Sequence, residues 1–195
     1  MLRTFFPTVA LCVTFLGASN GTVDRIDAVL GDNKELNPKT LSVAIHEQVN
    51  DVRVETGLPA LAWNGALRSV SVAHSDDMAR HSYFSHTNLD GESPSDRADR
   101  LGFECRPDQK DLKFGIGENL YAGYTYGTYT LARNNRRERI KRDWKDADQI
   151  VEEVVNGWLA SPGHRANLLE PNYIEEAIGV VITDDDRVYV TQNFC

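Results

Sequence analysis

The sequence predicts a three-layer α-β-α sandwich of the α+β class, with a small and mainly antiparallel sheet. Apolar residues recur at helical spacing in several segments, and two adjacent β-rich runs close the chain. These runs, 177–182 and Arg187–Phe194, are separated by three aspartates that form a turn, which indicates a hairpin. Helices interleaved with so few strands are typical of helices that cover both faces of a small sheet.

Two helices are predicted in the first half of the chain. Gly57 and Pro59 end the first helix, and Asn64 can cap the second. Each has one apolar face, formed by Leu41, Ile45, Val49 and Val52 in the first helix and by Leu67, Val70, Ala73 and Met78 in the second.

The middle of the chain carries a strong helix start. Ser93, Pro94 and Asp96 supply a cap, a proline at the first helical position and an acid at the third, and the helix should end at Gly102. The following segment, 114–124, is strand-like but contains three glycines, which let the backbone bend or approach a neighbour closely. Such a strand suits the presentation of Glu118 into a site.

A fourth helix should follow Asp146 or Asp148. Its apolar face points away from Glu152 and Glu153, which we therefore expect in solvent; this face consists of Ile150, Val151, Val154, Val155 and Trp158. Ser161 and Pro162 begin a further turn of helix, whose first turn contains His164.

The length of the chain and its apolar N-terminal segment indicate three parts. Residues 1–19 are a predicted signal peptide or N-terminal anchor, 20–38 a linker, and 39–195 one domain. The apolar run 5–18 follows a single basic residue, and it is short for a membrane span but right for a secretory signal. We therefore expect a secreted or envelope-associated protein, with membrane contact possible through the N-terminal segment. The net charge of −8 argues against nucleic acid as a partner.

The two cysteines beyond the leader, Cys105 and Cys195, suggest a disulfide in an exported protein. It would close a loop of about 90 residues. The alternative is a pair of free thiols, and geometry decides between the two.

Three of the five histidines are predicted to be structural. His74 lies on the same apolar helix face as Val70 and should lie at the edge of the core rather than bind a ligand. His46 and His81 have no neighbouring motif and receive the same interpretation.

Two histidines and one carboxylate lie instead beside turn-forming residues. They are His86, Glu118 and His164, in the motifs Tyr83-Phe84-Ser85-His86, Gly117-Glu118-Asn119 and Ser161-Pro162-Gly163-His164-Arg165. Imidazole and carboxylate groups are usable ligands for zinc or another borderline divalent cation.

In this combination the chain resembles the CAP superfamily, also called SCP-like, in its bacterial and archaeal branch. The motifs that match are the three above, extended to Ala166-Asn167, together with Asn88-Leu89-Asp90-Gly91, Arg97, Leu101-Gly102-Phe103, Trp158, Ile178-Gly179-Val180 and Tyr189-Val190-Thr191-Gln192-Asn193-Phe194. The resemblance runs from about residue 41 to the end of the sequence. It implies an α-β-α sandwich, secretion, and a large central cleft that contains His86, Glu118 and His164 and can hold zinc or another divalent cation.

The chain departs from the family pattern in three respects. Eukaryotic relatives place a second glutamate three residues after the tryptophan, where this chain has Ser161. Three ligands would leave an open metal position or bind the metal weakly. The cysteine-rich framework of eukaryotic members is absent.

The third departure is a basic insertion at about 125–145. It is expected to be a solvated helix or mobile loop, or a contact for an anionic wall polymer or lipid surface. The insertion contains Arg133, Arg136, Arg137, Arg139, Lys141, Arg142 and Lys145.

Two classes of function follow. The favoured one is an extracellular binding module, metal-modulated or not, for a cell-wall polymer, a peptide or a lipid-like ligand. The alternative is a metal-dependent hydrolase with His86, Glu118 and His164 as catalytic candidates. No H-E-x-x-H motif supports it. An acyl-transfer arrangement of Ser161, His164 and Glu118 is conceivable, but Ser161 is better explained as a helix cap.

Overall fold

The computed structural model describes residues 36–105, 115–134 and 137–195, with side chains outside 133–139. The predicted signal peptide or anchor and nearly all of the predicted linker lie outside these ranges. No helix among the described residues has the length and apolar character that a bilayer span requires.

Helices and strands follow one another largely as the apolar patterns predict. The described elements are α1 (Pro38–Glu55), β1 (Ala62–Trp63), α2 (Gly65–His81), α3 (Pro94–Arg100), β2 (Gly117–Tyr124), β3 (Tyr126–Asn134), β4 (Arg137–Trp144), α4 (Ala147–Ala160), α5 (Pro162–Leu168), β5 (Glu175–Ile182) and β6 (Arg187–Phe194).

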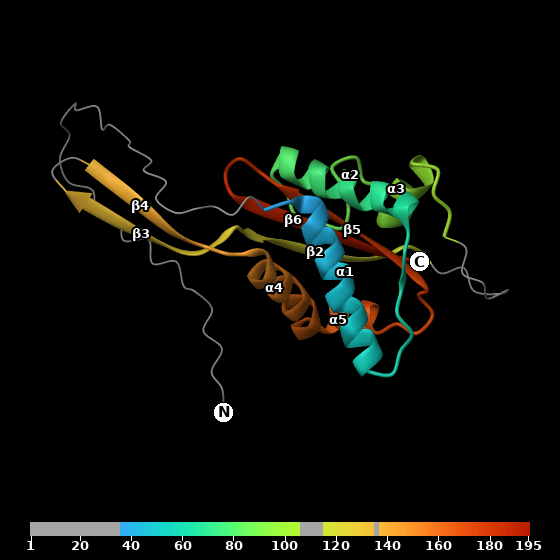
Figure 1. The fold of residues 1–195 in the computed structure, drawn as a ribbon. Helices are drawn as coiled ribbons and strands as arrows, with labels where there is room; N and C mark the ends of the chain where they lie inside the picture. Colours follow the sequence, from blue (N-terminus) through green and yellow to red (C-terminus); the bar gives the residue numbers. More distant parts are fainter. Residues whose placement is uncertain (1–35, 106–114, 135–136) are drawn as a thin grey trace.

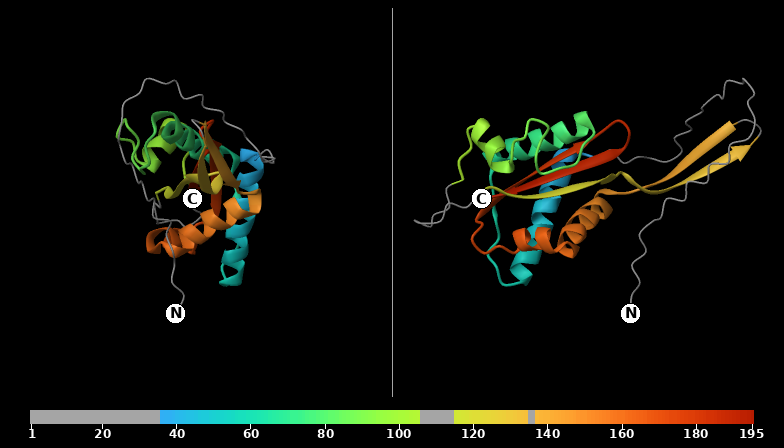
Figure 2. Two further views of the ribbon diagram at one scale, coloured as in Figure 1. Left: turned by 90° about the vertical axis from the view of Figure 1, so that its left-hand side faces the viewer. Right: turned by 180° about the vertical axis from the view of Figure 1, so that it is seen from behind.

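The main sheet has the strand order β1-β5-β6-β2. β1 pairs in parallel with β5, and the other two pairs are antiparallel. Helices α2 and α3 cover one face, and α1, α4 and α5 cover the other (Figures 1 and 2). The predicted three-layer α-β-α sandwich is thereby confirmed. β2 is an outer strand of this sheet, so side chains from both helical layers can meet around its edge.

Side-chain caps fix the helix starts. Ser93 and Asp96 form a reciprocal capping box at α3, as predicted, and the Asn64 side chain accepts hydrogen bonds at the start of α2. Asp146 caps α4 through a second capping box. Ser161 occupies the cap position of α5, but its side chain makes no capping hydrogen bond, so the predicted role of that hydroxyl is wrong.

The larger apolar core lies between the sheet and the layer of α1, α4 and α5. Trp158 is fully buried there, and its indole nitrogen donates to the carbonyl oxygen of Leu120 on β2 at 3.0 Å. Arg53 is also buried, and its guanidinium donates to main-chain carbonyls that include those of Pro59 and Leu168. The Arg53 guanidinium therefore links α1 to the end of α5. Glu152 and Glu153 are exposed, as helical phase predicts.

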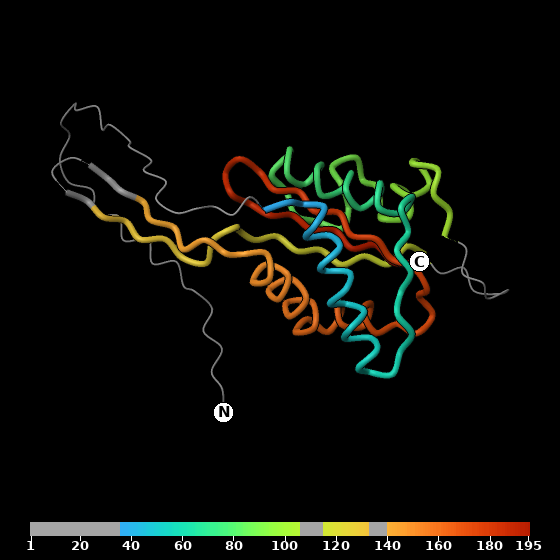
Figure 3. The backbone as a smooth tube through the Cα atoms, in the orientation of Figure 1, coloured from blue at the N-terminus to red at the C-terminus, as the bar shows by residue number. Residues whose placement is uncertain are grey.

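Segment 125–145 differs from the expected helix or loop. It forms a separate two-stranded sheet, β3–β4, that projects away from the three layers (Figures 1 and 3). The base of this hairpin is anchored where the main-chain nitrogen of Thr125 donates to the carbonyl oxygen of Asp186 at 2.9 Å. Alternating Tyr129 and Leu131 on one strand, opposite Arg142 and Ile140 on the other, explain why the segment pairs as strands.

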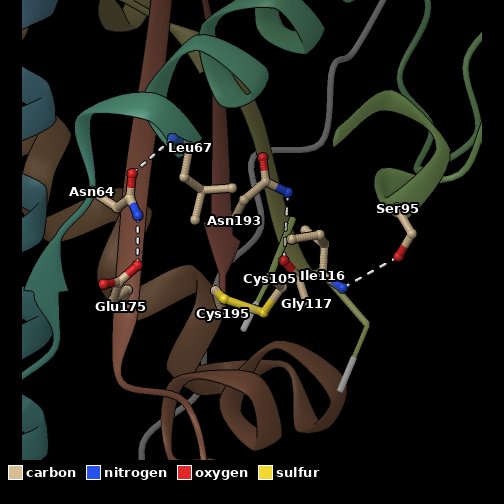
Figure 4. Close-up of a disulfide and its surroundings, with 9 residues drawn as sticks. All are labelled: Asn64, Leu67, Ser95, Cys105, Ile116, Gly117, Glu175, Asn193 and Cys195. Carbon is tan, nitrogen blue, oxygen red and sulfur yellow. Dashed lines mark hydrogen bonds between the residues drawn. A yellow bond between two sulfur atoms is a disulfide. The ribbon is translucent and has the colours of Figure 1, made fainter. Parts of the chain in front are cut away.

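Cys105 and Cys195 form the predicted disulfide, with 5.4 Å between their Cα atoms and a sequence separation of 90 residues (Figure 4). The bridge links the segment after α3 to the end of β6. It lies beside a small apolar cluster that includes Leu67 of α2 and Ile116.

The layer formed by α2 packs unusually close to β5 at Gly179. A Cβ atom at this position would lie 2.3 Å from the main chain of Ser71 and Val72. Backbone atoms cannot yield as a flexible side chain can, so any larger residue must push α2 away from the sheet.

Substitution of Gly179 by alanine should therefore destabilise the fold by about 1–3 kcal/mol through overpacking. Gly157→Ala is the matched control, because a Cβ at that exposed position of α4 meets nothing within 4 Å. The control should be stabilised by about 1 kcal/mol through helix propensity. Urea unfolding of both variants checks the pair, and equal stabilities would contradict the close packing of α2 on β5.

Reduction of the Cys105–Cys195 bridge should lower the free energy of unfolding by about 4 kcal/mol, because the reduced unfolded chain regains the entropy of a long loop. Urea titrations with and without a thiol reductant measure this loss. The Cys105→Ser/Cys195→Ser variant should match the reduced protein and ignore the reductant. An unfolding free energy that reductant leaves unchanged would show that the bridge contributes nothing.

Candidate functional site

The predicted carboxylate and the first predicted histidine lie in direct contact. Glu118 belongs to β2, and its side chain is only 2% exposed, whereas the side chain of His86 is 52% exposed. Nδ1 of His86 is 2.9 Å from Oε1 of Glu118 and donates to it. The buried carboxylate thus orients an exposed imidazole whose Nδ1 is already used.

Arg97 of α3 binds the other oxygen of Glu118. Its Nη2 donates to Oε2 at 2.5 Å, and the pair is buried on both sides. Asn193 of β6 donates to the same oxygen at 3.1 Å. Nη1 of Arg97 donates to the main-chain carbonyls of His86 and Glu92 at 2.8 and 3.0 Å, so one guanidinium holds both the carboxylate and the loop that carries His86.

The second predicted histidine comes from the opposite helical layer. His164 lies in α5, and its ring centroid is 6.4 Å from that of His86, with 61° between the ring planes. Partial burial lowers the pKa of His164 below its ordinary value, and the neighbouring His86 adds to this shift. The structure therefore brings His86, Glu118 and His164 into one site at the edge of the sheet.

Two asparagines attach α5 to the strand that carries Glu118. Nδ2 of Asn119 donates to the main-chain carbonyl of His164 at 3.1 Å. Nδ2 of Asn167 donates to Oδ1 of Asn119 at 2.9 Å and to the main-chain carbonyl of Glu118 at 3.0 Å. Consecutive residues of β2 thus fix the two halves of the site, Glu118 through its side chain on His86 and Asn119 through the backbone of His164.

His74 is buried behind the site, as its place on the apolar face of α2 predicts. Its Nε2 donates to the carbonyl oxygen of Ser85 at 2.9 Å and lies 3.9 Å from Oε1 of Glu118. Nδ1 is buried without a hydrogen-bond partner. Desolvation is the main cause that lowers the pKa of His74, so the neutral imidazole is favoured.

The remaining two histidines lie outside the site. His81 pairs with Asp77 on the exposed side of α2. His46 of α1 donates from Nδ1 to buried Glu176 at 2.6 Å, and the second oxygen of Glu176 accepts from Gln192 at 2.5 Å. Gln192 in turn accepts from Asn119 at 3.1 Å, so this network supports the strand beside the site.

The donor set suits a cation only in part. Among the described residues, no group of three or more histidine, cysteine, aspartate or glutamate side chains is arranged to hold a metal ion. Both oxygens of Glu118 already accept hydrogen bonds. Nε2 of His86 and the ring of His164 are the groups left to bind a ligand.

Sequence reasoning assigned no role to Arg97, Asn119, Asn167 or Asn193. All four stand within the motifs that carry the family resemblance, which was the available signal. Their function is to position other groups, because each contacts the main chain or the carboxylate of Glu118 rather than open solvent.

The lowered pKa of buried His74 should make the fold sensitive to acid. The native state binds fewer protons than the unfolded state below the unfolded pKa of about 6.5, so stability is complete above that pH and is lost as pH falls. The slope from this one group is at most about 1.4 kcal/mol per pH unit. Urea unfolding between about pH 7 and pH 5 measures it.

His74→Gln should flatten this pH dependence, because glutamine can still donate to Ser85 but does not titrate. His81→Gln, at an exposed position of the same helix, is the control. If His74→Gln keeps the full slope of the unmodified protein, the acid sensitivity arises elsewhere and burial of His74 is not its cause.

Known bacterial proteins share sequence and fold with this chain. A Bacillus subtilis protein named "uncharacterized membrane protein YlbC" is 31% identical over 150 residues, which are 77% of this chain and 33% of that protein. The structure of an extracellular protein with an SCP domain from Bacillus anthracis is 27% identical, with a TM-score of 0.55 over 80% of this chain and 40% of that one. The present chain therefore spans a third to two fifths of these relatives.

An outer surface protein from Borrelia burgdorferi shares the fold, with a TM-score of 0.58 and 18% identity over 82% of this chain and 94% of that one. The family model described as the cysteine-rich secretory protein family matches residues 46–194. This match covers the whole sheet and all three predicted site residues. The chain belongs to the cysteine-rich secretory protein, or CAP, family.

Proposed function

We propose that this protein is an extracellular binding module in which His86 and His164 form a polar site that a divalent cation modulates. The predicted export signal supports this location, as does the similarity to an extracellular Bacillus anthracis protein. The proposed ligands are a cell-wall polymer, a peptide or a lipid-like molecule from the envelope, and nucleic acid is not among them. The observation that carries the proposal is that the Glu118 carboxylate is buried and both of its oxygens already accept hydrogen bonds.

In the hydrolase alternative, Glu118 would orient or deprotonate a water held by a cation on His86 and His164. A general base must reach the proton that it removes and must have a free lone pair directed towards it. The Glu118 side chain is 2% exposed, and its oxygens accept from His86, Arg97 and Asn193. These contacts make it an orienting group, which favours binding over hydrolysis.

The same contacts indicate how a cation would be held. A carboxylate that accepts from one ring nitrogen of a histidine commonly leaves the other nitrogen to a metal ion and raises its basicity. In this arrangement Nε2 of His86 and the ring of His164 would hold zinc or another borderline cation, and Glu118 would support His86 without touching the metal. Zinc bound there would supply a Lewis acid with open positions for an oxygen of the ligand.

Two protein nitrogens bind a cation less tightly than the three or four ligands of a typical zinc site. The site should therefore exchange its metal and respond to the cation concentration outside the cell. This behaviour fits a modulated binding surface better than a permanent metal centre.

Calorimetric titration with zinc tests the proposal. The unmodified protein should bind one equivalent, and His86→Ala/His164→Ala should lose the binding because both ligands are gone. His81→Ala is the matched control, since it removes an exposed histidine outside the site and should bind zinc normally. Circular dichroism should show that all three proteins are folded, because the His86 side chain is exposed and that of His164 is only half-buried.

The same proteins should be incubated with casein and with cell-wall material, with and without zinc. The proposal predicts no hydrolysis by any of them. Zinc-dependent hydrolysis that the double substitution abolishes would replace the proposal with the hydrolase alternative. Zinc binding that survives the double substitution would show that the cation sits elsewhere.

A further inference from the structure

The β3–β4 hairpin is amphipathic and stands apart from the rest of the molecule. Opposed residues of an antiparallel pair share a face, and faces alternate along each strand. The register therefore puts Leu131 with Ile140 and Tyr129 with Arg142 on one face, and Thr130 with Lys141 on the other. We name the apolar members of the first face, with the aromatic residues at its base, the apolar stripe; it comprises Tyr126, Tyr129, Leu131, Ile140 and Trp144.

The base of the apolar stripe is an ordered cluster. The ring of Tyr126 meets those of Tyr129 and Trp144 edge to face, with centroids 6.4 and 6.1 Å apart. The guanidinium of Arg142 lies over both Tyr126 and Trp144, at 5.4 and 5.6 Å from their ring centroids. Lys145 adds an anchor through an ion pair with Glu153 of α4. The hairpin is thus fixed at its base.

Farther from the body, the apolar stripe is left in solvent. Tyr129 is 52% exposed and Leu131 is 58% exposed, and Ile140 is exposed as well. The hairpin extends past the helices that cover the main sheet (Figures 1 and 2). An isolated two-stranded sheet is marginal in water, and an apolar face with a polar rim marks a surface that another body covers.

The charge of the hairpin indicates which kind of partner covers the apolar stripe. Segment 125–145 contains seven basic and two acidic residues, a net charge of +5, within a chain whose net charge is −8. Hairpins from two copies of this chain would repel each other, so self-association through this face is disfavoured. A soluble polyanion would attract the charge but would leave Leu131 and Ile140 in water.

An anionic lipid bilayer satisfies both requirements. Its headgroups attract arginine and lysine, and its interface accepts tyrosine and tryptophan rings at headgroup level with aliphatic side chains below them. Arginine can keep its charge among the headgroups while its stem lies along apolar surface. We propose that the apolar stripe of the β3–β4 hairpin docks this protein onto an anionic membrane surface, independently of the His86–His164 site.

Vesicle co-sedimentation tests the proposal with the full-length protein. It should sediment with vesicles of phosphatidylglycerol and phosphatidylcholine, but not with phosphatidylcholine alone, and salt should weaken the binding. Leu131→Ser/Ile140→Ser should weaken it by about tenfold or more through lost apolar burial. Arg139→Gln/Lys141→Gln should do so through lost charge. Leu89→Ser/Ile174→Ser, which removes two exposed apolar side chains from the body, should bind normally.

A second measurement uses the unmodified protein and needs only one conservative substitution in the hairpin. Brominated lipids quench tryptophans at the bilayer interface. Trp144 lies on the stripe, whereas Trp158 is buried in the core and the half-buried Trp63 packs against the core away from the hairpin. Quenching should occur in the unmodified protein and should disappear in Trp144→Phe, which keeps the aromatic ring.

Four results would overturn the proposal. They are a failure of the unmodified protein to bind anionic vesicles, unchanged binding by Leu131→Ser/Ile140→Ser, quenching that persists in Trp144→Phe, and a dimer in solution that Leu131→Ser/Ile140→Ser dissociates. The last result would assign the stripe to a second copy of the chain.

Discussion

The buried ion pair between Arg97 and Glu118 is the interaction on which the site depends. Desolvation of two charges is costly unless their remaining donors and acceptors find partners. Here His86 and Asn193 complete the shell of the carboxylate, and two main-chain carbonyls accept from the guanidinium, whose Nε alone is buried without a partner. The pair therefore joins α3, β2, β6 and the His86 loop into one unit. Removal of either charge would leave the other buried without its counter-ion, which is strongly destabilising.

Side chains alternate along β2, so the adjacent residues Glu118 and Asn119 position different halves of the site. Glu118 reaches the His86 loop, while Asn119 holds the main chain of α5 at His164 and connects to the network of Gln192 and Glu176. Because β2 is an outer strand, these two sides meet at its edge. The site is thus exposed, although the groups that build it are buried. Such an arrangement suits a surface that recognises ligands and exchanges a cation.

Local signals predicted most of the fold. The caps at Asn64, Ser93 and Asp146 and the β5–β6 hairpin depend on residues close in sequence. β1 escaped prediction because two residues paired to β5 carry no periodicity. In β3–β4 the many basic residues hid the alternation that sets the register. The resemblance assigned His86, Glu118 and His164 to one cleft, but the role of Arg97 depends on contacts across three elements that no local pattern specifies.

A crystal structure of the zinc-soaked protein, with anomalous density at the zinc edge, tests the central claim most directly. We expect zinc bonded to Nε2 of His86 and to the ring of His164, with solvent in the remaining positions. Glu118 should still accept from His86 and Arg97, without a bond to the metal. Zinc bonded to a Glu118 oxygen that has left Arg97, or zinc bound away from both histidines, would contradict the account.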